Sequence, residues 1–364
     1  MKLKMKTVKL QDMVSRASKG ASNNKLIPIT SLMAIQLKDN VLTLITTDAT
    51  NYLYIEEQKV EGDDFYVVVP VDIFSKLIAR TTCENVTLTL HENLKILEVK
   101  GNGNYKIELP LDENGQLIKY PDPYIVSDNN VRQTIHLSTV KVILETLKSA
   151  LANTLEVPCY TGYYIGNSVI ATDTYKIADM DVQLLATPAL ISCELMDLLS
   201  VMTAEKIEVD EFDSGVIQFT TPDCRIYGRV MDDIDDFAVE PISALVNTEM
   251  ESFCAVNKTE FLQVLDRLEL FVGTYDKNAV RFTFTREGLE VSSKAASSVE
   301  IIPYVSSDSF IDFTCMIDVQ MITQEVKAIQ ADTIELYYGE DNAIIMKDGN
   351  ITIVVALLED EEGE

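Results

Sequence analysis

Apolar residues recur at helical spacing in six segments of the chain, and a stretch of alternating apolar and polar residues follows each one. In the third segment, Val140, Ile143, Leu144, Leu147 and Leu151 fall on one side of a helix. Period-two alternation predicts strands in mostly antiparallel sheets that bury one face. The six segments expected to be helical are Val8–Ser18, Val71–Thr82, Ser138–Leu151, Cys193–Met202, Lys258–Val272 and Val319–Ile329.

One phrase occurs twice at the end of a strand pattern. The residues Leu44–Tyr52 read Leu-Ile-Thr-Thr-Asp-Ala-Thr-Asn-Tyr, and Val169–Asp179 read Val-Ile-Ala-Thr-Asp-Thr-Tyr-Lys-Ile-Ala-Asp. Each copy predicts a strand, an Asp-led turn and a second strand. A helix that begins after a proline, Pro70 or Pro188, is expected to follow each copy. A repeat longer than 100 residues indicates tandem domains rather than a solenoid.

Two helix-and-strand units make one domain, which predicts an α+β fold with three similar domains in tandem. Each domain is expected to pack two helices on antiparallel sheets. Loop-like segments that begin at Tyr120 and at Glu240 suggest the boundaries. The predicted domains are residues 1–127, 128–247 and 248–364, and the last one ends in an acidic tail, Glu359–Glu364.

The composition is that of a globular protein, with 47% apolar and 24% charged residues among 364. No apolar run reaches the roughly 18 residues of a membrane span, and no apolar segment of a signal peptide follows Met1. Six cysteines stand singly, which favours free thiols in the cytoplasm. His91 and His136 lie beside apolar stretches and are interpreted as structural residues.

Candidate catalytic and metal-binding residues are few, so we do not expect an enzyme or a cofactor. The sequence has no phosphate-binding Gly-x-x-x-x-Gly-Lys loop, no His-Glu-x-x-His and no Gly-x-Ser-x-Gly. The acidic cluster Asp232–Asp236 offers oxygen ligands for Mg²⁺ but lacks the pattern of a calcium loop, which favours a solvated turn. Asp48 and Asp173 are expected to cap turns rather than to act as paired catalytic acids.

The net charge of −28 argues against tight binding to nucleic acid by counterion release. Nevertheless, several of the 30 basic residues fall opposite the apolar stripes of the predicted helices. Lys76 and Arg80 oppose the stripe of the second helix, and Lys141 and Lys148 oppose that of the third. Ordinary solvated helix faces remain the alternative interpretation.

The repeated Thr-Asp phrase and several other motifs of the chain resemble those of the bacterial DNA polymerase III β subunit, the sliding clamp. Ala171-Thr-Asp-Thr-Tyr-Lys-Ile stands where the family has Ala-Thr-Asp-Gly-His-Arg-Leu, and Val69-Pro70 opens the second helix in the same way. Tyr120-Pro-Asp and Asp236-Phe237 resemble the family's Phe-Pro-Asp. The C-terminal Ile353-Val-Val-Ala-Leu-Leu is similar to Val-Val-Met-Pro-Met-Arg-Leu. The differences suggest a divergent copy, such as one carried by a phage or a plasmid.

The resemblance implies a head-to-tail homodimer that forms a ring around duplex DNA and tethers the replicative polymerase and the clamp loader. Topology rather than strong contacts would hold such a ring on DNA, which is compatible with an acidic protein. The resemblance implies a sequence-independent inner lining. The residues assigned to it are Lys25, Lys76, Arg80, Lys141, Lys148, Lys258, Arg267 and Lys327.

The end of the fifth predicted helix carries more apolar residues than its core stripe needs, which suggests a partner surface. Packing under the following loop is the alternative. The resemblance places this corner against the first domain of the neighbouring subunit. The residues assigned to the dimer interface are Leu77, Ile78, Tyr105, Phe271 and Val272.

The resemblance also implies a groove that binds short apolar peptides of partner proteins. Its expected residues are Thr161, Thr172, Thr174, Tyr175, Lys176, Ile177, Val354, Val355, Ala356, Leu357 and Leu358. The acidic tail beside it predicts a preference for peptides with basic flanks. A core strand without a binding role is the alternative.

Two other functions fit the composition. An acidic scaffold or DNA mimic would imitate phosphates with its carboxylates, and it would bind DNA-binding proteins without DNA. A metal-dependent hydrolase would use the cluster Asp232–Asp236, and its metal binding would be lost when these residues become Asn.

Overall fold

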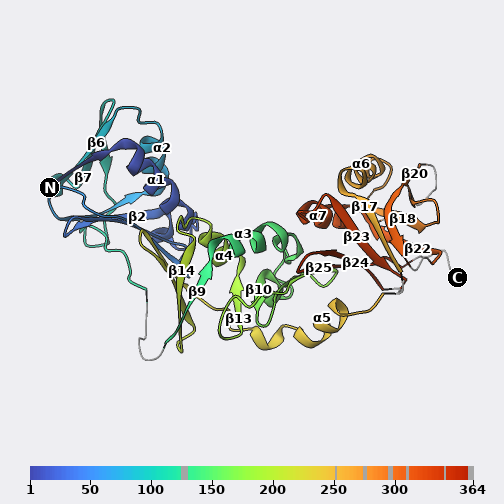
Figure 1. Ribbon diagram of the computed structural model, residues 1–364. Coiled ribbons are helices and arrows are strands. Elements are labelled where there is room, and N and C mark those ends of the chain that lie inside the picture. The colour runs from blue at the N-terminus through green and yellow to red at the C-terminus, as the bar shows by residue number, and fades with distance from the viewer. Residues whose placement is uncertain are drawn as a thin grey trace. The chain divides into compact units, whose positions relative to one another are not determined.

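The computed structural model describes residues 1–123, 130–250, 252–273, 277–293, 298–308, 311–339 and 342–359. The chain forms two compact units. Unit 1 consists of Met1–Val140 and Glu194–Val230, and unit 2 consists of Lys141–Cys193 and Met231–Glu364. Both units combine antiparallel sheets with helices, so the predicted α+β class is confirmed (Figure 1).

All six predicted helices are present; each begins within one residue of its predicted start and ends one to five residues earlier than predicted. A further helix, α5, replaces the boundary loop expected from Glu240. Pro241 lies in its first turn, where a proline is tolerated because the N–H it lacks has no helical partner, and Ile242 is buried. The helices are α1 (Thr7–Ala17), α2 (Val71–Ala79), α3 (Leu137–Thr146), α4 (Cys193–Leu199), α5 (Val239–Val246), α6 (Lys258–Glu269) and α7 (Val319–Ala328).

Unit 1 contains two antiparallel sheets. The four-stranded sheet has the order β1-β6-β7-β8, with β1 (Lys2–Lys6), β6 (Asn85–His91), β7 (Ile96–Lys100) and β8 (Asn104–Glu108). The eight-stranded sheet has the order β5-β2-β3-β4-β16-β15-β14-β9. Its strands are β2 (Leu32–Lys38), β3 (Val41–Thr47), β4 (Tyr52–Glu57), β5 (Phe65–Pro70), β9 (Asn130–His136), β14 (Lys206–Phe212), β15 (Val216–Thr221) and β16 (Cys224–Arg229).

Unit 2 has a matching arrangement. Its nine-stranded sheet has the order β13-β10-β11-β12-β25-β24-β23-β17-β21, and its four-stranded sheet has the order β20-β19-β18-β22. The strands of the longer sheet are β10 (Gly162–Ile165), β11 (Val169–Thr172), β12 (Lys176–Met180), β13 (Ala189–Ser192), β17 (Ser252–Asn257), β21 (Tyr304–Asp308), β23 (Thr333–Tyr338), β24 (Ala343–Asp348) and β25 (Ile351–Ala356). The shorter sheet comprises β18 (Ala279–Phe284), β19 (Leu289–Ser293), β20 (Val299–Ile302) and β22 (Phe313–Asp318).

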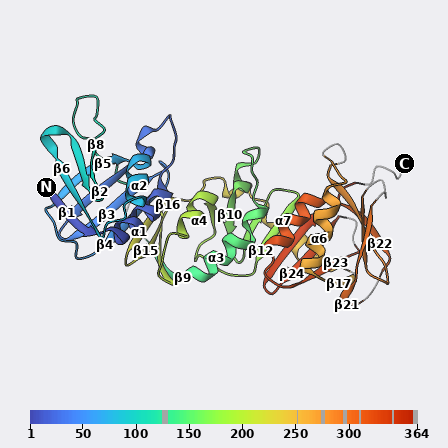
Figure 2. The same ribbon diagram turned by 90° about the horizontal axis from the view of Figure 1, so that it is seen from above.

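The helices of unit 2 cover both faces of its long sheet. Helices α6 and α7 lie side by side, and α7 packs on β25 (Figure 2). Helix α5 contacts β25 and β12 from the other side (Figure 1). Because successive residues of a strand point to opposite faces, neighbouring residues of β25 belong to different layers.

The two units follow the sheets rather than the predicted domain limits. In unit 1, β4 pairs with β16, and in unit 2, β12 pairs with β25. Each pairing joins a run of strands from one predicted domain to a run from the next and makes one continuous sheet. The limits at residues 127/128 and 247/248 therefore stay a prediction, and the first of them falls outside the described residues.

Arg16 connects distant parts of unit 1. Its Nε donates a hydrogen bond to the carbonyl oxygen of Val201 at 2.9 Å, and its Nη1 lies 2.7 Å from Oδ2 of Asp223 in the turn between β15 and β16. Burial alone raises the pKa of Asp223, but the hydrogen bond and charge of Arg16 outweigh this and hold the pKa below its usual value. The pair thus stabilises the folded unit while the carboxylate is ionised.

We expect Arg16→Met to lower the free energy of unfolding by about 2–3 kcal/mol at neutral pH, since charge-assisted hydrogen bonds are lost. Because the pKa of Asp223 is depressed in the folded state, the wild-type advantage is complete above about pH 4, the ordinary value for Asp. It should shrink as the pH falls through the lower, folded-state pKa. Urea unfolding at several pH values measures both effects.

Lys9→Met is the matched control, because Lys9 pairs with Glu57 at a largely exposed position and such pairs contribute little. An Arg16→Met deficit that does not change on acidification would mean that lost packing, not the ion pair, causes it.

Candidate functional site

The repeated Thr-Asp phrase forms the same turn in both units. Oγ1 of Thr172 donates a hydrogen bond to the carbonyl oxygen of Lys176 at 2.8 Å and accepts one from the N–H of Thr174 at 3.1 Å. Oδ1 of Asp173 accepts hydrogen bonds from the N–H groups of Tyr175 and Lys176. These interactions explain why a Thr-Asp pair is required where the strand turns.

The first copy repeats these bonds. Oγ1 of Thr47 donates to the carbonyl oxygen of Asn51, and Oδ1 of Asp48 accepts from the N–H groups of Thr50 and Asn51 at 2.8 and 2.7 Å. The carboxylates of Asp48 and Asp173 therefore cap turns, as the sequence predicts.

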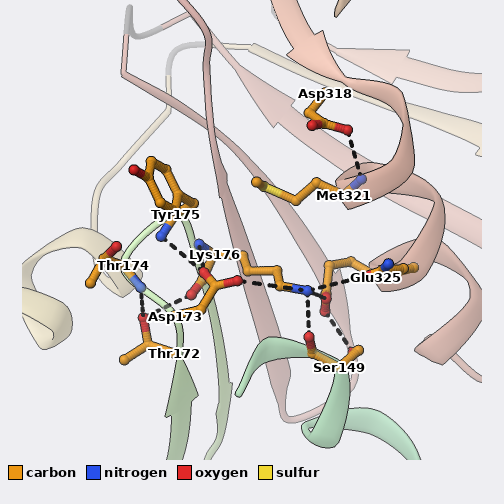
Figure 3. A network of polar contacts seen from close by, with 10 residues as sticks. Ser149, Thr172, Asp173, Thr174, Tyr175, Lys176, Asp318, Met321 and Glu325 are labelled. Carbon is orange, nitrogen blue, oxygen red and sulfur yellow. Dashed lines mark hydrogen bonds and ion pairs between the residues drawn. The ribbon is translucent and has the colours of Figure 1, made fainter. Parts of the chain in front are cut away.

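Both turns hold a non-glycine residue in the left-handed region. The φ angle is 82° at Thr174 and 89° at Ala49. Such residues are uncommon because the side chain crowds the backbone. At Thr174 the resembled family has glycine, so this chain keeps the turn at a cost in strain. The following side chain, Tyr175, is 64% exposed and points outward beside the strand end (Figure 3).

The strand register divides the expected groove residues between two faces of the sheet. Ile177 lies opposite Val354, and Lys176 lies opposite Val355. Residues opposite each other share a face, so Ile177 and Val354 point one way and Lys176 and Val355 the other.

Ile177 and Val354 belong to the face that α5 covers. They form an apolar cluster with Ile242 of α5 and Ile345 of β24. The rings of Tyr160 and Tyr164 pack around Phe237 beside it. Of the expected groove residues, Thr174 and Tyr175 are exposed at this end of the sheet, while Thr161, Ala356, Leu357 and Leu358 are half-buried.

Three expected groove residues need correction. Val355 is fully buried, and Lys176 and Thr172 are 5% and 2% exposed. The side chains of Val355 and Lys176 lie on the face of the sheet that α7 covers. The hydroxyl of Thr172 is hydrogen-bonded within the turn. Assigning consecutive strand residues to one groove was wrong because alternate side chains cannot face the same way.

Lys176 instead makes a buried network under α7 (Figure 3). Its Nζ lies 3.1 Å from Oε1 of Glu325, donates to Oε1 of Gln324 at 3.1 Å, and donates to the carbonyl oxygen of Ser149. The hydroxyl of Ser149 donates to Oε2 of Glu325 at 3.1 Å. Burial raises the pKa of Glu325, whose side chain is fully enclosed, and the positive charge of Lys176 opposes the rise. The network fixes the start of β12 and therefore the turn that presents Tyr175.

The sequence analysis missed several residues of this site, among them Tyr160, Ile242 and Ile345. Their signal was present in part, because Ile242 and Val246 stand four residues apart in a segment interpreted as a loop. The other two were not distinguishable from ordinary core residues without the sheet order.

Some expected DNA-binding residues are exposed, and others already have partners. Lys25, Arg80, Lys141, Lys148 and Lys327 are exposed. Lys76 is exposed and pairs with Asp72 one turn earlier on α2. Outward acidic residues also stand on the same helices, so neither unit presents a purely basic helix face.

Lys258 and Arg267 are engaged within unit 2. Nζ of Lys258 donates to the carbonyl oxygen of Ile329 and, at 3.3 Å, to that of Lys327. The guanidinium of Arg267 makes two hydrogen bonds to Glu300, of 2.8 and 2.5 Å. These bonds raise the pKa of Arg267 and lower that of Glu300. A phosphate would have to compete with these partners.

The residues assigned to a dimer interface also differ in exposure. Phe271 is 60% exposed and Tyr105 is 42% exposed, while Leu77 and Val272 are half-buried. Ile78 is 1% exposed in the core of unit 1, so it has no surface to offer a partner, and its assignment is withdrawn. Strands β8 and β20 are the end strands of their sheets.

The acidic cluster forms a short 3₁₀ turn, Ile234–Asp236, with Asp232, Asp235 and Asp236 exposed. Within the described ranges, no three His, Cys, Asp or Glu side chains are grouped to hold a metal ion. The six cysteines are free thiols. In the part of the chain that the structure describes, no helix is long and apolar enough to cross a membrane.

Comparison with solved structures identifies the fold as that of the bacterial DNA sliding clamps. The sliding clamp of Bacillus subtilis is 17% identical with a TM-score of 0.82, and the β subunit of Thermotoga maritima is 18% identical with a TM-score of 0.83; each match covers 99% of both chains. A clamp from Bartonella birtlesii bound to griselimycin is 14% identical with a TM-score of 0.83, covering 99% of this chain and all of that one.

The sequence comparison gives a family match for the first part of the chain. Residues 1–116 match the family model of the DNA polymerase III beta subunit, N-terminal domain. No curated protein sequence matches the chain. The clamp fold therefore extends over the whole chain, and the family signal is carried by its first 116 residues.

Lys176→Met should lower the free energy of unfolding by about 3–5 kcal/mol, because it leaves the Glu325 carboxylate buried without a countercharge. The pKa of Glu325, already raised by burial, should rise further. A folded-state pKa above the unfolded one means that the folded state binds more protons. The deficit should therefore shrink as the pH is lowered, as measured by urea unfolding.

The double variant Lys176→Met with Glu325→Gln should recover part of the loss, since no buried charge remains. Lys347→Met, in β24 of the same sheet, serves as the control. Additive losses in the double variant would contradict a direct interaction between the two side chains.

Proposed function

We propose that this protein is a DNA sliding clamp, a processivity factor without catalytic activity that encircles duplex DNA and tethers replication proteins. The observation that carries the proposal is the match of 99% of the chain to bacterial sliding clamps at TM-scores of 0.82 to 0.84. The family match of residues 1–116 supports it independently. A DNA mimic or a hydrolase has no comparable support.

The proposal includes three domains, at residues 1–127, 128–247 and 248–364. Each long sheet supports this division, because it consists of two runs of strands joined at one ladder. The runs β5-β2-β3-β4 and β13-β10-β11-β12 have the same internal order, and so do β16-β15-β14-β9 and β25-β24-β23-β17. The four-stranded sheets complete the first and third domains.

Ring closure is proposed through the free strand edges. An end strand presents unpaired N–H and C=O groups that can pair with another chain. Strand β8 carries Tyr105, and β20 carries the exposed Val299 and Ile301. Helix α6 contacts β20 and ends next to Phe271, so apolar residues accompany the edge on unit 2. A contact between unlike surfaces, made twice, closes a two-fold ring.

The acidic charge is compatible with this function. A clamp needs only weak phosphate contacts inside, because strong ones would stop it from sliding. The exposed Lys25, Lys76, Arg80, Lys141, Lys148 and Lys327 are the proposed contacts. Lys258 and Arg267 take a lesser role, because Lys258 donates to backbone carbonyl groups and Arg267 makes two hydrogen bonds to Glu300. We infer a cytoplasmic protein from the six free cysteines.

The partner site is proposed where β12 begins and β25 ends, on the sheet face that carries Ile177 and Val354. Thr174, Tyr175, Ala356 and Leu357 form its accessible part, with Ile177 and Val354 beneath them. Two or three apolar side chains of a peptide, each worth about 1.5–3 kcal/mol when enclosed, provide the affinity. The acidic residues after Leu358 favour basic flanks on the peptide.

The clamp proposal predicts that the protein, once loaded, stays on nicked circular DNA and is lost when the circle is cut, measured by gel filtration. Phe271→Asp should give a folded monomer by light scattering and should abolish retention, because a charge would be buried in the ring contact. Leu245→Asp, a matched change at another exposed apolar residue, should leave both unchanged. Equal retention on linear and circular DNA would refute the clamp.

The partner-site proposal is tested with a fluorescein-labelled peptide in which leucine and phenylalanine stand between pairs of lysines. Leu357→Ala should weaken the binding of this peptide roughly tenfold, as expected for a loss of about 1.4 kcal/mol in binding free energy. A chain ending at Leu358 keeps the backbone bonds of Leu357 and Leu358 to Asn342 and Met316. It should bind the peptide more weakly at low salt only.

Leu94→Ala, an exposed leucine of unit 1, is the control. Dissociation constants, measured by fluorescence anisotropy, that are the same for all variants would contradict both the site and the effect of the tail.

A further inference from the structure

Unit 1 contains a pocket of about 450 Å³ beside the first Thr-Asp turn. Its wall includes Thr50 of the turn, Tyr52 of β4, Val216 of β15, and Tyr227 and Arg229 of β16, and Asp122 closes one side. None of these residues belongs to the proposed partner site, which lies in unit 2. The volume falls within the range of sites for small ligands or for a few side chains.

The strand registers place this pocket at the position that the partner site occupies in unit 2. Tyr52 lies opposite Tyr227 as Ile177 lies opposite Val354. Likewise, Val216 lies opposite Arg229 as Ala343 lies opposite Ala356. Thr50 and Tyr175 occupy the same place in the two turns, two residues after the Asp that caps each turn. The backbone is therefore arranged in the same way at both positions.

The side chains give the unit 1 recess a different chemistry. Where unit 2 has Ile177 and Val354, unit 1 has two tyrosines, and burial raises the pKa of Tyr52, so its phenol stays neutral. Tyr120, whose hydroxyl donates to the carbonyl oxygen of Leu32 at 3.1 Å, packs in the apolar cluster below. The recess therefore has aromatic walls with hydroxyl groups rather than aliphatic ones.

The charged residues of the recess narrow the class of ligand that it can bind. Arg229 is exposed, and among the described residues it has no ion-pair partner. Asp122 also lines the recess, and its charge contributes to the raised pKa values of Tyr52 and Tyr54. A ligand that matches both would place a carboxylate at Arg229 and a hydrogen-bond donor, such as a peptide N–H, at Asp122.

We propose that this recess is a second partner site, which binds a short peptide with an apolar or aromatic side chain next to Asp or Glu. That the ligand is a peptide rests on the proposed function; the recess and its charges do not. The charge preference is opposite to that expected of the unit 2 site, so one clamp subunit binds two classes of partner through equivalent positions.

Calorimetric titration at low salt tests this with two heptapeptides that share a Leu-Phe core, one flanked by Asp and one by Lys. Thr50→Trp fills the mouth of the recess from an exposed turn position, and Arg229→Glu reverses its charge. Both variants should bind the Asp-flanked peptide at least fivefold more weakly than the wild type. Arg286→Glu, the same charge change in the turn between β18 and β19, should leave it unchanged. Circular dichroism verifies that each variant is folded.

Ala356→Trp in unit 2 separates this proposal from the proposed function. It should weaken the binding of the Lys-flanked peptide and leave the binding of the Asp-flanked peptide unchanged. If Ala356→Trp changes neither titration while Thr50→Trp weakens the Asp-flanked peptide, the unit 2 site fails and the second site stands.

Equal binding of the Asp-flanked peptide by wild type, Thr50→Trp and Arg229→Glu would overturn the second site, as would no binding by the wild type at millimolar peptide. A change of oligomeric state in Thr50→Trp, seen by light scattering, would also overturn it, because a second copy of the chain would then be the occupant.

Discussion

Two antiparallel ladders, β4 with β16 and β12 with β25, are the constraint on which the rest of the structure depends. Each ladder joins two runs of strands into one sheet, so that segments more than a hundred residues apart share a continuous backbone hydrogen-bond network. The Thr-Asp turn comes directly before β4 and before β12 and sets where each ladder begins. The position of the unit 1 recess follows from that turn, because Ala49 and Thr50 of the turn line it.

The ladders also decide which side chains are available for binding. On β25, Val354 faces α5, while Val355 faces the side of α7, where Lys176 and Glu325 form their enclosed pair. A buried pair of this kind adds little net stability over an apolar pair of the same shape, but it tolerates no loss of one member. Its effect is to hold β12 and α7 in one arrangement, and with them the turn that presents Tyr175.

The acidic composition acquires a physical meaning only when the partners of the basic residues are known. Lys9, Lys76, Arg225 and Arg267 all lie next to carboxylates, and Lys258 caps the end of α7. Arg229, in contrast, is exposed and has no ion-pair partner among the described residues. If the chain is a clamp as proposed, it is held on DNA by topology and needs only weak phosphate contacts. At the proposed unit 1 recess, an exposed cation in such an acidic chain favours an acidic partner.

The sequence by itself determined the α+β class, the six predicted helices and the repeated turn, because hydrophobic periodicity and the hydrogen bonds of Thr and Asp are local properties. It did not determine α5, since Pro241 and the short apolar pattern also fit a loop. For the expected site residues the sequence did not determine exposure: Tyr175 and Leu357 lie at accessible positions, whereas Val355, Lys176 and Ile78 are buried. Which face of a strand meets a helix, and which strand pairs with which, depend on segments far apart in the chain. Only the tertiary structure decided these, because a shift of one residue in register reverses every side chain along a strand.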